Sequence, residues 1–214
     1  MENKLMSKSF LWMFVGLLVT FITGFVVSHN ETMLINIFSN SIYIILAIIE
    51  LVLVVVLSAR VYKMNKNTAR ICFLLYSFIT GLTFSSIFVV YNLTSIIYVF
   101  LIASLIFLIF GLIGYFTKLD LTKLGSFLLM ALLAIIVCLV VNIFVKSSSF
   151  DLGITIISIL VFIGFTAYDV YKIKNTSYDN LPEDNLSIIF ALNLYLDFIN
   201  IFLNLLNLLG NSKD

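Results

Sequence analysis

Long apolar runs, separated by short polar connections, make up almost the whole chain. Seven of them approach the 20 or so residues that a helix needs to cross the hydrocarbon core of a membrane: 9–28, 41–59, 71–91, 95–116, 125–145, 152–173 and 187–209. Apolar residues follow one another without alternation, for instance over 44–49 and 51–57, which excludes a membrane β-barrel. The pattern predicts an all-α integral membrane protein, a bundle of seven transmembrane helices that forms a single domain over residues 1–214.

The composition agrees with a chain whose surface faces lipid. Hydrophobic residues make up 62% of the chain and charged residues 11%, whereas a soluble domain spends about a quarter of its residues on charge. The net charge of +1 gives no reason to expect a nucleic-acid partner. The connections are short, and they contain no glycine-rich phosphate loop. We therefore expect membrane lipid as the environment and no cofactor.

Cysteine and histidine add little chemistry. Cys72 and Cys138 fall inside different apolar runs, where we expect them at different depths, so the sequence predicts no disulfide between them. His29 stands at the outer end of the first run. A zinc site would need several ligands that converge, and the sequence does not indicate them.

The distribution of lysine and arginine predicts the orientation in the membrane. Basic residues resist translocation and gather on the cytoplasmic side. With the N-terminus inside, Lys146 and Lys213 lie outside, and ten basic residues lie inside: Lys4, Lys8, Arg60, Lys63, Lys66, Arg70, Lys118, Lys123, Lys172 and Lys174. We therefore expect a cytoplasmic N-terminus and an external C-terminus. The first run is too long for a signal peptide, so we expect it to be retained, in a bacterial plasma membrane.

Three acidic residues fall inside predicted spans. Glu50 lies near the middle of the second span, Asp169 near the end of the sixth and Asp197 in the seventh. A charged side chain at such a depth costs on the order of 3 kcal/mol or more. Because no basic residue lies at mid-membrane to pair with them, these acids favour an ion or proton pathway. A structural role as protonated polar groups is the alternative.

The seventh span also carries a polar stripe, formed by Asn193, Asp197, Asn200, Asn204 and Asn207. Their spacings of 4, 3, 4 and 3 residues place all five on one face of a helix. Amides that faced lipid would be left unsatisfied, so the stripe must face protein or water. We therefore expect the C-terminal helix to be central in the bundle. Its stripe either lines a pathway or joins helices through hydrogen bonds.

The same residues carry a resemblance to a known family. The dipeptide Tyr168-Asp169 and the run ALNLYLDFINIFLNLL at 191–206 resemble the transmembrane BAX inhibitor motif family, and in particular its bacterial calcium-leak members. Glu50, Arg60 at the inner end of the second span, and the run TGLT at 80–83 also fit that family.

The resemblance implies a pH-sensitive, passive Ca²⁺ leak that is not an enzyme. In such proteins two aspartates, here Asp169 and Asp197, share a proton and gate a pore lined by the last helix. An arginine, here Arg60, holds the first aspartate in the closed state. Ca²⁺ and protons are then the expected partners, with Ca²⁺ as the permeant ion held transiently by Asp197 and Asp169. Glu50, Asn193, Asn200 and Asn204 are the expected pore-lining residues.

Three other functions stay open. An intramembrane aspartyl protease also uses Tyr-Asp on one helix and an aspartate on the next, but its Gly-x-Gly-Asp motif is absent, since Leu194, Tyr195 and Leu196 precede Asp197. A proton-coupled transporter favours helices broken by Gly or Pro, and the last span has neither before Gly210. A membrane scaffold that acts by interaction is the third.

Overall fold

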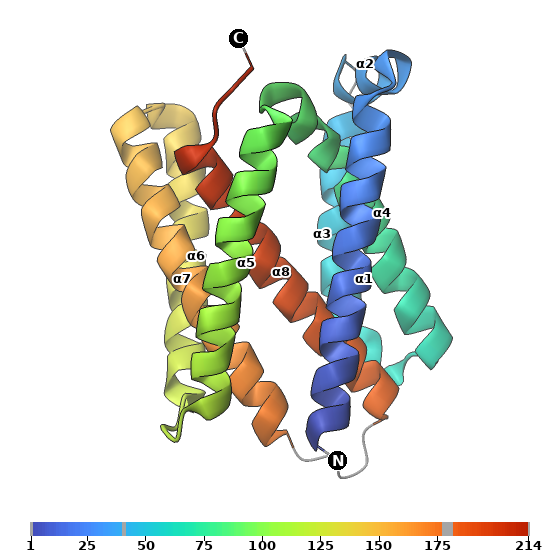
Figure 1. Ribbon diagram of the computed structural model, residues 1–214, viewed down its shortest axis with the longest axis vertical. Helices are drawn as coiled ribbons and strands as arrows, with labels where there is room; N and C mark the ends of the chain where they lie inside the picture. The colour runs from blue at the N-terminus through green and yellow to red at the C-terminus, as the bar shows by residue number, and fades with distance from the viewer. Residues whose placement is uncertain (1, 40–41, 177–181, 214) are drawn as a thin grey trace. The chain divides into compact units, whose positions relative to one another are not determined.

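A computed structural model of the protein describes residues 2–39, 42–176 and 182–213, and there every long element is a helix (Figure 1). The helices are α1 (Glu2–Ser28), α2 (Glu31–Ser39), α3 (Ile42–Arg60), the 3₁₀ turn η1 (Val61–Lys63), α4 (Lys66–Val90), α5 (Leu93–Phe116), α6 (Thr122–Val145), α7 (Ser148–Asn175) and α8 (Glu183–Leu209). Seven of them, all except α2 and η1, are long and apolar enough to cross a membrane. The all-α membrane fold and the seven spans are thus confirmed.

Two short elements were missing from the sequence prediction. The helix α2, of nine residues, follows the first span, and η1 follows the second. Neither reaches the length of a membrane span. The predicted start of the second span, residue 41, and the C-terminal Asp214 lie outside the described residues.

Local side-chain chemistry fixes several helix ends. The side chain of Asn65 accepts a hydrogen bond from the backbone N–H of Asn67 at the start of α4, and Ser147 accepts one from Phe150 at the start of α7. These bonds satisfy amide groups that have no partner within the helix. Lys146, with φ of 51°, ends α6 in the left-handed conformation that often closes a helix.

The chain divides into two compact units. The first comprises Met1–Leu93, Ser177–Tyr195 and Ser212–Asp214, and the second comprises Thr94–Thr176 and Leu196–Asn211. The helix α8 contributes its first half to the first unit and its second half to the second. That all seven spans form a single domain stays a prediction.

In the first unit α1 packs closely against α4 (Figure 1). Gly24 and Gly81 permit this approach, because a Cβ on Gly24 would lie 3.1 Å from the carbonyl oxygen of Gly81. A Cβ on Gly81 would lie 2.9 Å from the carbonyl oxygen of Thr20. Small residues at a membrane helix interface allow such backbone contact.

Charged residues gather where α1, α4 and α8 begin. The ammonium group of Lys8 lies 2.9 Å from a carboxylate oxygen of Glu183 and 3.0 Å from one of Asp184. Arg70 lies 3.4 Å from the same oxygen of Asp184 and stacks over the ring of Trp12. These ion pairs tie the N-terminal end of α8 to the first unit.

The opposite end of α4 holds the C-terminal tail. Tyr91 and Ser212 form an isolated antiparallel bridge. The backbone N–H of Lys213 donates to the carbonyl of Val90 at 2.8 Å, and its ammonium group donates to the carbonyl of Phe88 at 2.7 Å. Within the first unit, the N-terminal charged residues and the C-terminal tail therefore lie at opposite ends of a helix about 37 Å long.

The second unit contains α5, α6, α7 and the second half of α8. The helices α6 and α7 pack through Leu128, Ile135, Ile154 and Val161. In the same unit, the rings of Phe198 and Phe202 on α8 pack edge-on against Phe100 of α5. Of the seven spans α8 has the largest buried share, 78% of its most apolar window, which confirms that the last helix is central.

Candidate functional site

Asp169 and Asp197 come together in the second unit, where α7 meets α8. Both side chains are buried, with 5% of Asp169 and 4% of Asp197 exposed. They are close enough that the charge of Asp169 acts on Asp197.

The surroundings of Asp197 do little to stabilise a negative charge. Its Oδ2 atom is buried without a hydrogen-bond partner among the described residues. On α7, three residues before Asp169, Thr166 is fully buried and its hydroxyl donates to the carbonyl of Phe162 at 2.9 Å. A second negative charge beside a buried carboxylate is unfavourable, so one proton on the pair lowers the energy of both groups.

The two lysines in the last turn of α7 contact a backbone carbonyl and an aromatic ring. The ammonium group of Lys174 donates to the carbonyl of Tyr115 at 2.7 Å. The ammonium group of Lys172 lies over the ring of Tyr168, 5.8 Å from its centroid.

Asn193, Asn200 and Asn204 of the polar stripe are half-buried and Asn207 is exposed, whereas several apolar positions between them are deeply buried. Leu194, Phe198 and Leu205 are at most 6% exposed. The side-chain N–H of Asn200 donates to the carbonyl of Leu196 at 2.8 Å, and that of Asn204 donates to the carbonyl of Asn200 at 2.7 Å. These bonds use the side-chain N–H groups and not the side-chain oxygens, which are acceptors.

The C-terminal end of the stripe contacts another helix. The side-chain N–H of Asn207 donates to the hydroxyl of Thr155 on α7 at 3.2 Å. The stripe and α7 therefore face one another at two levels in the second unit, at this contact and at the aspartate pair. The stripe was predicted either to line a pathway or to join helices, and Asn207 joins helices.

The other predicted pore-lining residues belong to the first unit. The carboxylate of Glu50 is half-buried on α3 and accepts a hydrogen bond of 2.9 Å from the hydroxyl of Thr83 on α4. Asn193 is half-buried on α8. The structure does not test the predicted role of either residue in conduction.

Arg60 is the last residue of α3 and is exposed. It belongs to the first unit and Asp169 to the second. An ion pair between the two stays a prediction.

A buried hydroxyl network in the first unit escaped the sequence analysis. Thr20 of α1 donates to the carbonyl of Ser77 on α4 at 2.8 Å, and the hydroxyls of Thr20 and Tyr195 lie 2.6 Å apart. Tyr195 is fully buried and its ring packs edge-on against Phe73 and Tyr76. The signal for it was a single phenol group in an otherwise apolar part of the last helix, opposite the polar stripe.

The described residues contain no group of three or more His, Cys, Asp and Glu side chains that could hold a metal ion. Cys72 and Cys138 are free, as predicted. Two carboxylates with amide oxygens nearby on one helix would give a cation at most a weak, transient site, because Ca²⁺ takes six to eight oxygen ligands in its stable sites.

Comparison with known proteins agrees with the resemblance. The family described as Bax1-I, Inhibitor of apoptosis-promoting Bax1, matches residues 2–214. An inner membrane protein of Escherichia coli, YbhL, is 41% identical over 97% of this chain and 92% of its own. An uncharacterized protein of Borreliella burgdorferi is 40% identical over 100% of this chain and 94% of its own. An uncharacterized membrane protein of Streptococcus pyogenes is 37% identical over 78% of this chain and 73% of its own. With seven spans and this match over its whole length, the chain is an integral membrane protein of the Bax1-I family.

Proposed function

We propose that this protein is a pH-sensitive, passive Ca²⁺ leak in a bacterial plasma membrane. The observation that carries the proposal is the buried pair of Asp169 and Asp197 on α7 and α8, in which one oxygen of Asp197 lacks a partner. Burial of two charged carboxylates inside membrane spans is unfavourable unless a proton or a cation neutralises charge on the pair. Family membership adds support, since the same two helices carry the most specific part of the resemblance.

The aspartate pair is the proposed pH sensor. Two adjacent carboxylates in a medium of low dielectric cannot both be charged at low cost, so they bind and lose a shared proton as a unit. Protonation removes one charge and supplies a donor to the other carboxylate. The proposed partners in this step are protons from the cytosol.

Arg60 is the proposed latch. A charged Asp169 attracts its guanidinium group and holds the closed state, whereas a protonated Asp169 does so far less strongly. This latch gives the direction of the pH dependence. Proton binding at low pH releases the latch and raises the Ca²⁺ flux, whereas proton loss at high pH restores the latch and lowers the flux.

Ca²⁺ is the proposed permeant ion, and oxygen ligands would guide it. Asp197 supplies charge, and Asn200 and Asn204 supply side-chain oxygens whose own N–H groups are already bonded to the helix. Asn193 and Glu50 would extend the path in the first unit. An inside-negative potential of 100 mV drives a divalent cation inward by about 4.6 kcal/mol, so the leak needs no cofactor and no enzymatic step.

For the orientation we propose a cytoplasmic N-terminus and an external C-terminus, as the lysine and arginine bias requires. The opposite positions of the N-terminal charged residues and the C-terminal tail along α4 support an odd number of crossings.

A membrane scaffold is the second candidate, because the family's description names inhibition of another protein. Purified protein in liposomes that contain a Ca²⁺-sensitive dye separates the two functions. A leak raises the dye signal on addition of external Ca²⁺, faster at pH 6 than at pH 8, whereas a scaffold leaves it at the level of empty liposomes.

A further inference from the structure

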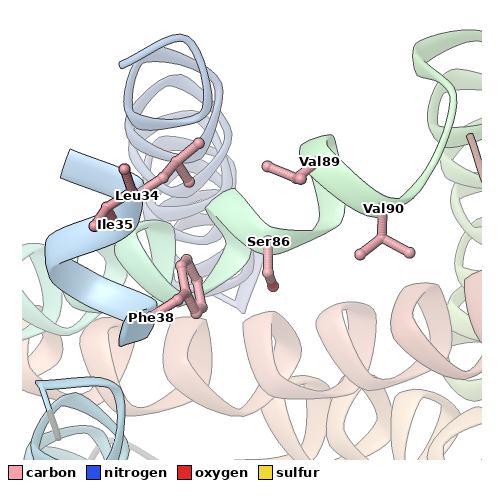
Figure 2. A pocket seen from close by; sticks show the side chains of 6 residues that line it. All are labelled: Leu34, Ile35, Phe38, Ser86, Val89 and Val90. Atoms are coloured by element: carbon pink, nitrogen blue, oxygen red, sulfur yellow. The ribbon is translucent and has the colours of Figure 1, made fainter. Parts of the chain in front are cut away.

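A pocket lies in the first unit, beneath the short helix α2 and beside the last turn of α4. Figure 2 shows its lining: Leu34, Ile35 and Phe38 come from α2, and Ser86, Val89 and Val90 come from α4. Its volume is about 300 Å³, which is at the lower end of the range for small-molecule sites. None of the lining residues belongs to the aspartate pair or to the polar stripe.

The lining is hydrocarbon with one hydroxyl, and that hydroxyl is already bonded. The hydroxyl of Ser86 donates to the carbonyl of Thr83 in its own helix at 2.9 Å. A polar ligand would therefore lose its bonds to water and gain no replacement from these side chains. The chemistry of the pocket favours an alkyl chain.

The position of the pocket favours the same ligand. Ser86 lies four residues before the end of α4, which places the pocket about 6 Å below the end of a membrane span. Several lining side chains are also largely exposed, among them Ile35 at 60% and Val90 at 49%. In a membrane protein such exposed apolar side chains face hydrocarbon.

A cation stands at the same end of α4. The ammonium group of Lys213 is held by the carbonyl of Phe88, and its backbone N–H by the carbonyl of Val90, which itself lines the pocket. An ammonium group at the end of a span attracts the phosphate of an anionic lipid. It retains two N–H donors beyond the one that Phe88 accepts.

We propose that this pocket binds one acyl chain of an anionic phospholipid, with Lys213 contacting the headgroup. The bound acyl chain stabilises the packing of α2 against α4 from within the membrane. The proposal is independent of the Ca²⁺ leak, because it uses no residue assigned to that function.

The test uses the full-length protein in nanodiscs that contain either phosphatidylglycerol or phosphatidylcholine, each with a photoreactive diazirine in one acyl chain. Peptide mapping after illumination should find adducts concentrated in 34–38 and 86–90. Ser86→Trp, which fills the pocket, should reduce these adducts to the level of other exposed spans. Leu75→Trp, on an exposed position of the same helix outside the pocket, should leave them unchanged.

Lys213→Ala gives a second measurement that leaves the membrane spans intact. It should lower the preference for phosphatidylglycerol over phosphatidylcholine about fivefold, the effect of one basic residue near a membrane surface. Adducts spread evenly over all exposed spans and unaffected by Ser86→Trp would overturn the proposal. Absence of lipid adducts from 34–38 and 86–90, as expected if a second copy of the chain covers the pocket, would overturn it as well.

Discussion

The hydroxyl oxygens of Thr20 and Tyr195 lie 2.6 Å apart inside the first unit, and both residues are almost completely buried. The single proton of Thr20 is directed to the carbonyl of Ser77 at 2.8 Å. The phenol of Tyr195 is therefore the donor in the contact between the two hydroxyls. This bond links α1 to the half of α8 that precedes the aspartate pair.

Loss of that bond should weaken the first unit. Tyr195→Phe keeps the ring and removes the donor, so we expect a loss of about 1 kcal/mol, the net contribution of a typical hydrogen bond. Tyr98→Phe is the control, because Tyr98 is 69% exposed. The apparent melting temperature in detergent should fall by about 2–4 °C for Tyr195→Phe and stay unchanged for Tyr98→Phe. Equal values for both variants would show that the bond contributes nothing.

Two glycines on α5 should respond differently to the same substitution. A Cβ on Gly114 would fall onto the carbonyl oxygen of Ala167 in α7, whereas one on Gly111 would meet its nearest neighbour, Val170, at 3.7 Å. Backbone cannot yield as a side chain does, so Gly114→Ala should cost about 1–3 kcal/mol. Gly111→Ala should be neutral or gain up to about 1 kcal/mol from helix propensity. Thermal unfolding of the two variants in detergent checks this, and a Gly114→Ala variant as stable as Gly111→Ala would contradict the packing described for α5 and α7.

The sequence predicted the seven spans and the central last helix because both depend on hydropathy and on side chains of one helix. It missed α2, since nine residues are too few to register as a span. It also missed the pairing of Thr20 with Tyr195 and of Lys8 with Asp184, because contacts between residues about 175 apart leave no periodic mark.

For the candidate site, residue types were predictable and bonding was not. The sequence predicted the two aspartates as site residues because they are acids inside apolar runs, and the structure places Asp169 beside Asp197. The spacing of the stripe could not show that the amides of Asn200 and Asn204 bond to their own helix. The contact of Asn207 with Thr155 joins the stripe to another helix through a hydrogen bond.

The proposed orientation predicts opposite accessibility for two engineered cysteines. In a background of Cys72→Ala and Cys138→Ala, a membrane-impermeant thiol reagent should label Ser212→Cys from outside intact cells. Asn65→Cys should become labelled only after the membrane is opened, since Asn65 caps α4 at its basic end. Labelling of both positions from the same side would exclude an odd number of crossings between them and the proposed topology with it.

The latch predicts a gain of flux when Arg60 is removed. Arg60→Ala should raise Ca²⁺ entry into liposomes at pH 8 by at least about fivefold, the lower range for coupling between two sites. At pH 6, where the latch is already released, the variant and the wild type should agree. Lys63→Ala is the matched control, because Lys63 is a basic residue three positions after Arg60, at the end of η1. If Arg60→Ala and Lys63→Ala leak equally slowly at pH 8, Arg60 serves only to orient the protein.

The proton-sharing aspartate pair is tested most directly by the pH dependence of Ca²⁺ flux in its two amide variants. Wild-type flux should fall as the pH rises from about 6 to 8, as the shared proton is lost. Asp169→Asn cannot engage the latch, so its flux should be high and flat, and Asp197→Asn should be flat with a lower flux, because the charge that attracts the cation is gone. Asp151→Asn, on the first turn of the same helix as Asp169, should keep the wild-type profile. Flat profiles in the two pair variants alone are the result that we predict, and a wild-type pH profile in both of them would contradict the mechanism.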